Sequence, residues 1–161
     1  MSVIDWQAAL KQIRRWQAVG DSIVFSNGCF DLLHAGHIEI LTAARNLGDR
    51  LVLGLNSDAS VARLKGSQRP IVPEADRAVI MAALKMVDLV VIFNEDTPAR
   101  LIEFLTPDIL VKGADYQPEE IAGGTHVLKS GGQIKTIPLV PGYSTSAIIT
   151  KIRLLNEAEK S

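Results

Sequence analysis

Hydrophobic positions along the chain form short continuous apolar runs that alternate with stretches of helical spacing. Over residues 1–20 the spacing is helical and the pattern stops at Gly20, a residue that commonly follows helices. The apolar positions of this first helix are Trp6, Leu10, Ile13 and Val19. Further helices are predicted at about 36–47, 74–84, 98–105 and from 144 onwards. Five apolar runs are typical of buried strands, at 22–26, 50–56, 88–93, 108–111 and 133–139.

Continuous apolar strands that alternate with helices predict a parallel sheet covered on both faces. The fold class is therefore α/β, with a Rossmann-like, doubly wound, five-stranded parallel sheet. A chain of 161 residues, 47% of them hydrophobic, suffices for one well-buried core. We expect one domain over 1–161, made of an N-terminal helix at 1–20 and a core at 21–161. The Gly-, Pro- and Ser-rich stretch 65–73 is predicted to be a loop of that domain.

Composition narrows the choice of partners and compartment. The 17 Lys and Arg residues against 18 Asp and Glu give a formal net charge of -1, so we expect no nucleic-acid partner. Cys29 is the only cysteine, which excludes an intrachain disulfide. No run approaches the ~18 apolar residues of a membrane span, and the N-terminus lacks the apolar region of an export signal. We therefore expect a cytoplasmic protein without a membrane partner.

The loop after the first strand carries the most unusual pattern of the chain. It reads NGCFDLLHAGH over 27–37 and places His34, Gly36 and His37 at the start of a helix. Ligands of parallel sheets bind at the carboxyl ends of the strands, where this loop lies. A helix N-terminus attracts anions, imidazoles can donate hydrogen bonds to phosphate oxygens, and glycine lets a ligand approach the backbone. The pattern predicts a phosphate-binding site.

Other interpretations of the same residues remain open. His34 can cap the helix while His37 lies in the interior, or the pair can share a zinc ion, although no third ligand is evident. Cys29 beside a histidine can be the nucleophile of a thiol hydrolase. The fingerprints G-x-G-x-x-G and G-x-x-x-x-G-K-[ST] are absent, which disfavours dehydrogenases and P-loop NTPases. The pairs at 123–124 and 131–132 are expected to be turns.

Four segments resemble a known family. VFSNGCFDLLHAGH at 24–37 resembles the first signature of the cytidylyltransferase-like nucleotidyltransferases. Residues 55–77, 107–123 and 142–152 are similar to the adenylyltransferase half of bacterial heptose-phosphate kinase/adenylyltransferase proteins, and the resemblance covers about 22–153. It implies transfer of AMP from ATP to D-glycero-β-D-manno-heptose 1-phosphate, which gives ADP-heptose and pyrophosphate for lipopolysaccharide core biosynthesis. Because a kinase half is missing, a stand-alone enzyme is expected. A CTP-dependent enzyme acting on glycerol 3-phosphate, and a non-catalytic nucleotide sensor, are the alternatives.

The resemblance also implies roles for individual residues. The acceptor phosphate attacks the α-phosphorus of ATP, so catalysis consists of positioning and charge stabilisation. The implied catalytic residues are His34, His37 and Lys65. The implied nucleotide-binding residues are Cys29, Phe30, His34, Gly36, His37, Lys112, Gly113, Asp115, Tyr143, Ser144 and Thr145. The implied substrate-binding residues are Asp31, Lys65 and Arg77.

Several of these roles have ordinary alternatives. Lys65 can be a solvated loop lysine, Arg77 can pair with Glu74 or Asp76, and Ser144 can be a helix cap. Mg²⁺ is expected to arrive with ATP, without dedicated protein ligands. The family suggests a homodimer.

Overall fold

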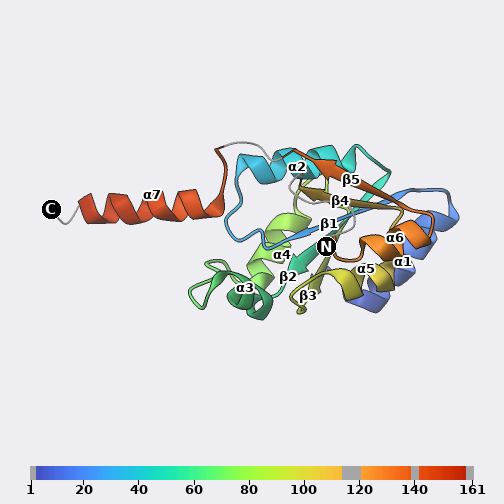
Figure 1. The fold of residues 1–161 in the computed structure, drawn as a ribbon, viewed down its shortest axis with the longest axis horizontal. Coiled ribbons are helices and arrows are strands. Elements are labelled where there is room, and N and C mark those ends of the chain that lie inside the picture. The colour runs from blue at the N-terminus through green and yellow to red at the C-terminus, as the bar shows by residue number, and fades with distance from the viewer. Residues whose placement is uncertain (1–2, 114–120, 139–141, 159–161) are drawn as a thin grey trace.

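The computed structural model describes residues 3–113, 121–138 and 142–158 (Figure 1). Its helices are α1 (Trp6–Ala18), α2 (Ala35–Arg45), α3 (Asp58–Lys65), α4 (Glu74–Ala82), α5 (Ala99–Leu105), α6 (Gly124–Lys129) and α7 (Thr145–Ala158). Its strands are β1 (Ile23–Gly28), β2 (Arg50–Asn56), β3 (Leu89–Phe93), β4 (Ile109–Gly113) and β5 (Gln133–Ile137). Within the described residues, no helix is long and apolar enough to cross a membrane.

The five strands form one parallel sheet in the order β3-β2-β1-β4-β5. Val24 of β1 pairs with Leu51 of β2 on one side and with Ile109 of β4 on the other. The predicted α/β fold with a doubly wound parallel sheet is confirmed. The chain moves outward from β1 first toward β3 and then toward β5, so the strand order reverses at β1 and β4. Such a reversal is where parallel sheets open a crevice for ligands.

Helices cover both faces of the sheet, each over its own apolar core. One core joins α1, α5 and α6 to alternate strand residues such as Phe25, Val52 and Leu110. The other joins α2 and α4 to the intervening residues, such as Val24, Leu53 and Val111. Successive strand residues point to opposite faces, so strands buried on both sides need continuous apolar runs. Figure 1 shows the two helical layers on either side of the strands.

The N-terminal helix packs against the sheet. Trp6 Nε1 donates a hydrogen bond to Ile92 O at 2.9 Å, which ties the start of α1 to β3. Near the other end of α1, Gln17 Nε2 donates to Asp108 Oδ2 at 3.2 Å, and the same carboxylate oxygen accepts from Ile23 N at 2.8 Å. The helix therefore belongs to the core around β1, β3 and β4.

The sequence prediction missed two short helices, α3 and α6. Helix α3 has 8 residues and begins after Ser57, whose side chain accepts a hydrogen bond from Ser60 N. Helix α6 has 6 residues and begins at Gly124, directly after the predicted turn residue Gly123, whose φ is 82°. Helices this short give little periodicity. The loop predicted to begin at Asn27 begins later, because Asn27 and Gly28 still belong to β1.

Helix α7 differs from the other helices because it projects from the body of the molecule (Figure 1). None of its described residues is buried. Large apolar side chains are exposed on it, among them Ile152, Leu154 and Leu155. Only its first turn reaches the crevice beside β1 and β4.

Candidate active site

The loop from β1 to α2 presents the two predicted histidines at the start of a helix. After β1 the chain turns through Phe30, whose φ of 45° lies in the left-handed region, and α2 begins at Ala35. His34 occupies the N-cap position with extended backbone, but its side chain makes no capping hydrogen bond. The alternative that His34 serves as a side-chain cap is therefore wrong.

The two imidazoles stack on each other, and one nitrogen of each ring has no hydrogen-bond partner among the described residues. Their ring centroids lie 3.7 Å apart with an interplanar angle of 18°. Both Nδ1 atoms are buried and have no hydrogen-bond partner among the described residues. Burial and the neighbouring His34 lower the pKa of His37 to about 4, and burial lowers the pKa of His34. Both rings are therefore neutral near pH 7. Buried polar atoms usually have a partner, so this pair points to a ligand.

Gly36 is required for this close packing. A Cβ atom at position 36 would lie 2.9 Å from Tyr143 Cβ and 3.2 Å from His34 Nδ1. Any larger residue would displace the stacked histidine or the segment that precedes α7. Gly36 itself lines the cleft at the start of α2, where the helix dipole favours an anion.

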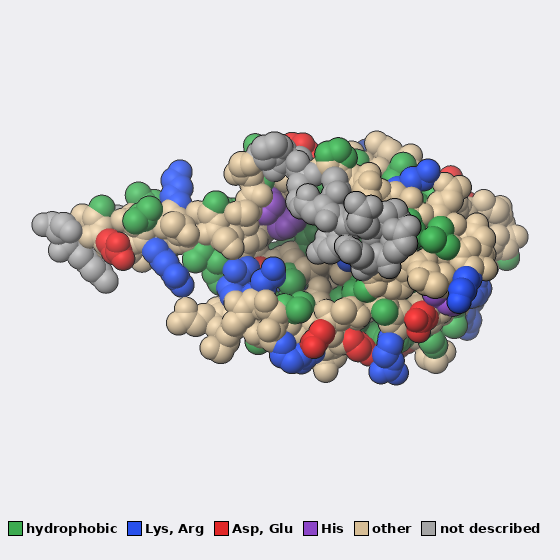
Figure 2. All heavy atoms as spheres, viewed as in Figure 1, with side chains coloured by type: hydrophobic (Ala, Val, Ile, Leu, Met, Phe, Trp, Pro, Cys, Tyr) green, Lys and Arg blue, Asp and Glu red, His purple; other side chains and the backbone are tan. Residues whose placement is uncertain are grey.

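The histidines open into a cleft of about 720 Å³ at the carboxyl ends of the strands. In Figure 2, histidine and Lys or Arg side chains border the hollow where α7 leaves the body. The predicted site residues that line this cleft are Cys29, Phe30, Asp31, His34, Gly36, His37, Lys65, Lys112, Tyr143, Ser144 and Thr145. Gly113 lines an adjoining cavity of about 180 Å³ that shares several of these residues. Asp115 lies outside the described residues.

Lys112 brings a positive charge into the cleft from β4. Its Nζ donates a hydrogen bond to Asn27 Oδ1 at the end of β1, and burial lowers its pKa to about 8. The ammonium group is still mostly protonated at pH 7. Sequence analysis did not identify Asn27 as a site residue. Its position at the carboxyl end of a central strand was the signal that could have done so.

Lys65 and Arg69 bring cations to the opposite wall. Lys65 is the last residue of α3, lines the cleft and has an exposed side chain. Arg69 Nε donates to Asp31 Oδ2, while its two terminal nitrogens make no protein hydrogen bond within the described part of the chain. Sequence analysis missed Arg69. A second cation four residues after Lys65, in the same motif, was the available signal.

The carboxylate of Asp31 accepts hydrogen bonds from within the protein. Its carboxylate accepts hydrogen bonds from Arg69 Nε, from Ile71 N at 2.8 Å and from Val72 N at 2.9 Å, and its side chain is 1% exposed. Burial alone would raise the pKa of Asp31, but the hydrogen bonds from Val72 and Arg69 bring it below its ordinary value. This carboxylate holds the 69–72 segment against the β1 loop, and the predicted role of Asp31 in acceptor binding stays a prediction.

Arg77 is also turned away from the cleft. Its side chain is 0% exposed, does not line the cleft and pairs with Asp58 at 2.7 Å. Both the predicted phosphate contact and the alternative pairing with Glu74 or Asp76 are wrong. In the first turn of α4, Arg77 lies on the buried face with Ala78 and Met81, four residues before Met81.

The thiol of Cys29 does not resemble an activated nucleophile. Burial raises its pKa, and the charges of Lys65, Arg77 and Arg69 offset only part of that effect. Its sulfur makes no hydrogen bond to either imidazole among the described contacts. A thiol hydrolase needs a thiolate or an adjacent base, so the geometry disfavours this alternative.

The segment before α7 closes the remaining side of the cleft. Tyr143 lies parallel to His34, with ring centroids 6.2 Å apart and an interplanar angle of 20°. Ser144 Oγ accepts from Ala147 N at 3.0 Å, so the alternative role as a helix cap is realised. Thr145 Oγ1 donates to Leu32 O at 3.4 Å and links α7 to the β1 loop.

The cleft does not contain a protein metal centre of the usual kind. Within the described residues, no group of three or more His, Cys, Asp and Glu side chains could hold a metal ion. The described part of the chain therefore offers the histidine pair no further ligands of the kind that a structural zinc site needs.

The strand order reverses at the cleft, two imidazoles with unpartnered Nδ1 atoms among the described residues lie at a helix N-terminus, and cations line two walls of the cleft. These features define an α/β protein that binds a phosphorylated ligand. Residues 25–151 match the family model described as "Cytidylyltransferase-like", and the chain belongs to this family. The predicted superfamily is confirmed.

Proteins that are similar to the chain in sequence or structure support this family assignment. The chain is 56% identical over 150 residues to "Bifunctional protein HldE" of Magnetococcus marinus, a match that covers 93% of this chain and 31% of the relative. It is 59% identical over 134 residues to the protein of the same name from Geotalea uraniireducens, covering 83% and 27%. The chain thus spans about a third of the length of these relatives. A solved structure, the "lipopolysaccharide core biosynthesis protein from Thermoplasma volcanium GSS1", has 32% identity and a TM-score of 0.62, covering 75% of this chain and 98% of that one.

Proposed function

We propose that the chain transfers AMP from ATP to D-glycero-β-D-manno-heptose 1-phosphate and releases pyrophosphate, in lipopolysaccharide core biosynthesis. The single observation that carries the proposal is the pair of half-buried, stacked imidazoles at the N-terminus of α2, whose buried Nδ1 atoms have no hydrogen-bond partner among the described residues, inside a family of nucleotidyltransferases. The heptose substrate is supported by the identity to HldE proteins over most of this chain and by the similarity to the lipopolysaccharide core biosynthesis protein of Thermoplasma volcanium. We further propose that residues 1–161 act as one unit, since both cores share one sheet.

The nucleotide occupies the side of the cleft formed by the β1–α2 loop, β4 and the segment before α7. His34 and His37 donate to phosphate oxygens, and these contacts strengthen as charge develops during transfer. Gly36 and the first amides of α2 add backbone donors and a favourable dipole. Lys112 with Gly113, and the Tyr143–Thr145 segment, contact the rest of the nucleotide, and Asp115 is proposed for its ribose or base.

The acceptor phosphate binds between the nucleotide and the α3 side of the cleft. Lys65 and the free nitrogens of Arg69 are the cations on that wall, and Arg69 takes the role first predicted for Arg77. The acceptor phosphate is already a nucleophile near neutral pH, so the protein needs to align it with the α-phosphorus and neutralise charge. No covalent intermediate on the protein is required.

Mg²⁺ fits this cleft as a companion of ATP. The described residues offer no carboxylate cluster to hold it, and Asp31 is engaged with Arg69, which suits an ion bound mainly by phosphates and water. When bound, Mg²⁺ neutralises phosphate charge and stabilises the departing pyrophosphate.

We also propose a cytoplasmic homodimer. ATP and sugar phosphates are cytoplasmic metabolites, which supports the compartment. A second copy would cover Ile152, Leu154 and Leu155 of α7, and an isolated helix of this length is marginally stable in water. Light scattering after gel filtration tests this part, and a monomer mass at micromolar concentration would contradict it.

The reaction is tested by supplying heptose 1-phosphate and Mg²⁺ with ATP or CTP in parallel, and measuring pyrophosphate and the nucleotide sugar. ATP-dependent pyrophosphate together with ADP-heptose supports the proposal. Turnover only with CTP, or only with glycerol 3-phosphate as the acceptor, would replace the substrates and favour the cytidylyltransferase alternative. Binding of ATP without turnover of any acceptor would favour a nucleotide sensor.

A further inference from the structure

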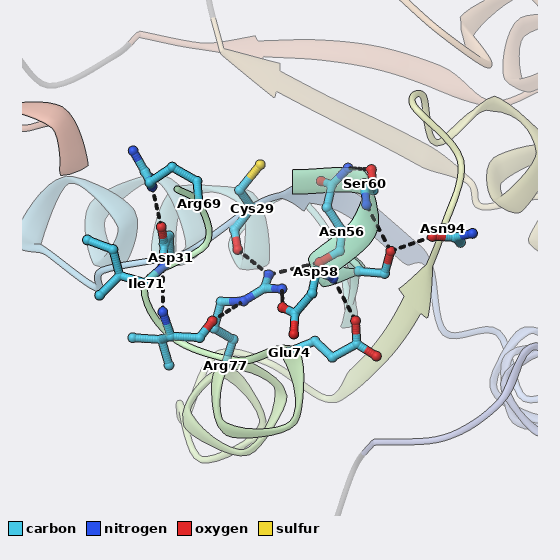
Figure 3. Close-up of polar contacts among 12 residues, drawn as sticks. Cys29, Asp31, Asn56, Asp58, Ser60, Arg69, Ile71, Glu74, Arg77 and Asn94 are labelled. Atoms are coloured by element: carbon cyan, nitrogen blue, oxygen red, sulfur yellow. Dashed lines mark hydrogen bonds and ion pairs between the residues drawn. The ribbon is translucent and has the colours of Figure 1, made fainter. Parts of the chain in front are cut away.

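Arg77 is a buried cation that the proposed reaction does not use directly. Its Nη1 donates to Cys29 O at 2.6 Å and to Asn56 O at 2.8 Å, and its Nε donates to Val72 O at 2.9 Å. Its Nη2 donates to Asp58 Oδ1 at 2.7 Å. Figure 3 shows the guanidinium between the segments that supply these acceptors. One side chain on α4 thus joins the ends of β1 and β2 to the segment before α4.

The partners of Arg77 are one carboxylate and three main-chain carbonyls. Burial of a guanidinium costs several kcal/mol unless good partners compensate, as a general rule. Here a single carboxylate, on Asp58, supplies the opposite charge, and that side chain is 43% exposed. The other three acceptors are main-chain carbonyls. Because the guanidinium is planar with its donors in a fixed fork, it fixes the orientation of those carbonyls in a way that a lysine cannot.

The position of the Cys29 carbonyl determines the direction in which the N–H group of Phe30 points. The peptide group that joins Cys29 to Phe30 is planar and trans, so its C=O and N–H point in opposite directions. Arg77 holds the C=O on the side away from the cleft, whereas Phe30 lines the cleft. Phe30 N makes no hydrogen bond to a protein acceptor within the described residues. The N–H therefore faces the space in which the phosphates are proposed to bind.

The same turn also positions the ring of Phe30. The left-handed φ of 45° is unfavourable for an L-residue and persists only where the surroundings impose it. Phe30 then places its ring edge-on to His37, with centroids 5.0 Å apart. The hydrogen bond from Arg77 to Cys29 O thus influences the orientation of the Phe30 N–H group and the packing of His37, a proposed catalytic residue.

We propose that Arg77 is a positioning residue, which holds the Cys29–Phe30 peptide group so that Phe30 N–H donates to a phosphate oxygen of the bound nucleotide. The inference rests on the proposed phosphate role of the cleft and adds a fixed backbone donor to it. A purely structural role predicts lower stability alone. The positioning role predicts a loss of turnover in enzyme that remains folded.

The kinetic test uses Arg77→Lys, which keeps the positive charge and removes the planar, fixed arrangement of donors. We expect kcat to fall about 100-fold, the usual order for the loss of one preorganised donor. The matched control is Val127→Ala, a fully buried position in the other core, which lowers the melting temperature while kcat stays at the wild-type value. Both variants are assayed at a temperature at which circular dichroism shows them folded. Equal kcat in Arg77→Lys and the control would overturn the proposal.

A second measurement needs no variant. Pyrophosphate is titrated into ¹⁵N-labelled wild-type protein, and the amide signal of Phe30 is followed together with the ring signals of His34 and His37. The proposal predicts that the amide and the rings shift together. Shifts of the rings with an unmoved Phe30 amide would overturn the positioning role and leave the proposed function standing. If neither signal moves, the phosphate site itself fails, and the role of Arg77 fails with it.

Discussion

Asp31, in the wall of the cleft, and Arg77, behind that wall, make their hydrogen bonds within the protein. In contrast, His34 and His37 leave both Nδ1 atoms without a partner among the described residues. The two pairs meet in the same β1–α2 loop. Asp31 and Arg77 hold the loop to the segment before α4, and the histidines face the open cleft.

This difference separates residues that build the site from residues that act in it. All four belong to family motifs, so the motifs alone do not assign them to either role. The deciding feature is whether the donors and acceptors of a side chain are already paired in the ligand-free fold. By this criterion we propose that His34, His37, Lys65 and the terminal nitrogens of Arg69 face the ligand, while Asp31 and Arg77 support the loop.

Removing an imidazole from the ligand-facing side should have the largest effect on turnover. His37→Ala is expected to lower kcat about 100- to 1,000-fold, as for the loss of a preorganised transition-state donor. Its stability should change by less than about 2 kcal/mol, because among the described residues the ring packs on Phe30 and His34 and makes no hydrogen bond. Steady-state pyrophosphate release and thermal unfolding measure the two effects.

The third histidine provides the control for this variant. His126 lies on α6 and its Nε2 is within 3.0 Å of Thr106 Oγ1, away from the cleft. His126→Ala should keep the wild-type kcat. A loss of stability in His37→Ala as large as its loss of activity, both expressed as free energies, would mean that His37 supports the fold and does not act on the ligand.

The exposed cation on the other wall should have a smaller but clear effect. Lys65→Ala is expected to lower kcat/KM about 10- to 100-fold, since charge stabilisation at the acceptor phosphate is lost. Its unfolding free energy should stay within about 0.5 kcal/mol, as for other surface positions. The control Lys85→Ala removes an exposed lysine near the amino end of β3. Equal kinetics in the two variants would mean that Lys65 is an ordinary solvated lysine.

Asp31 should reveal its supporting role through acid stability. Its pKa is lowered in the folded state, so its contribution is present above the unfolded pKa near 4 and is lost as pH falls through the folded value. Asp31→Asn should cost roughly 3 kcal/mol at pH 7 because Arg69 loses its buried partner. Below about pH 4 the difference from wild type should shrink. Urea unfolding at pH 7 and pH 3 measures this, and a constant difference would contradict the assignment.

The smallest effect is expected at Cys29, whose carbonyl and not its thiol is engaged. Cys29→Ser should change kcat by less than about twofold, because the raised pKa keeps the thiol protonated and unreactive. Loss of most activity in this variant would revive the thiol-hydrolase alternative.

Sequence patterns predicted the fold more completely than the site. Five apolar runs defined the five strands, and the spacing of the histidines located the cleft. Short helices were missed because one or two turns show no clear period. The role of Arg77 was misassigned because a motif does not reveal which way a side chain points. Its position four residues before buried Met81 on α4 was a usable signal, whereas the hydrogen bond that joins Asn27 to Lys112 depends on how two strands distant in sequence come together.

The claim that His34 and His37 hold the phosphates is tested most directly by the NMR titration of His37 with and without ATP. In the free protein the pKa of His37 should lie at about 4. A bound phosphate favours the protonated ring, so ATP should raise this pKa by about one unit or more, and by linkage ATP should bind more tightly as pH falls through this range. We predict this increase in the pKa of His37. An identical titration curve at saturating ATP would contradict it.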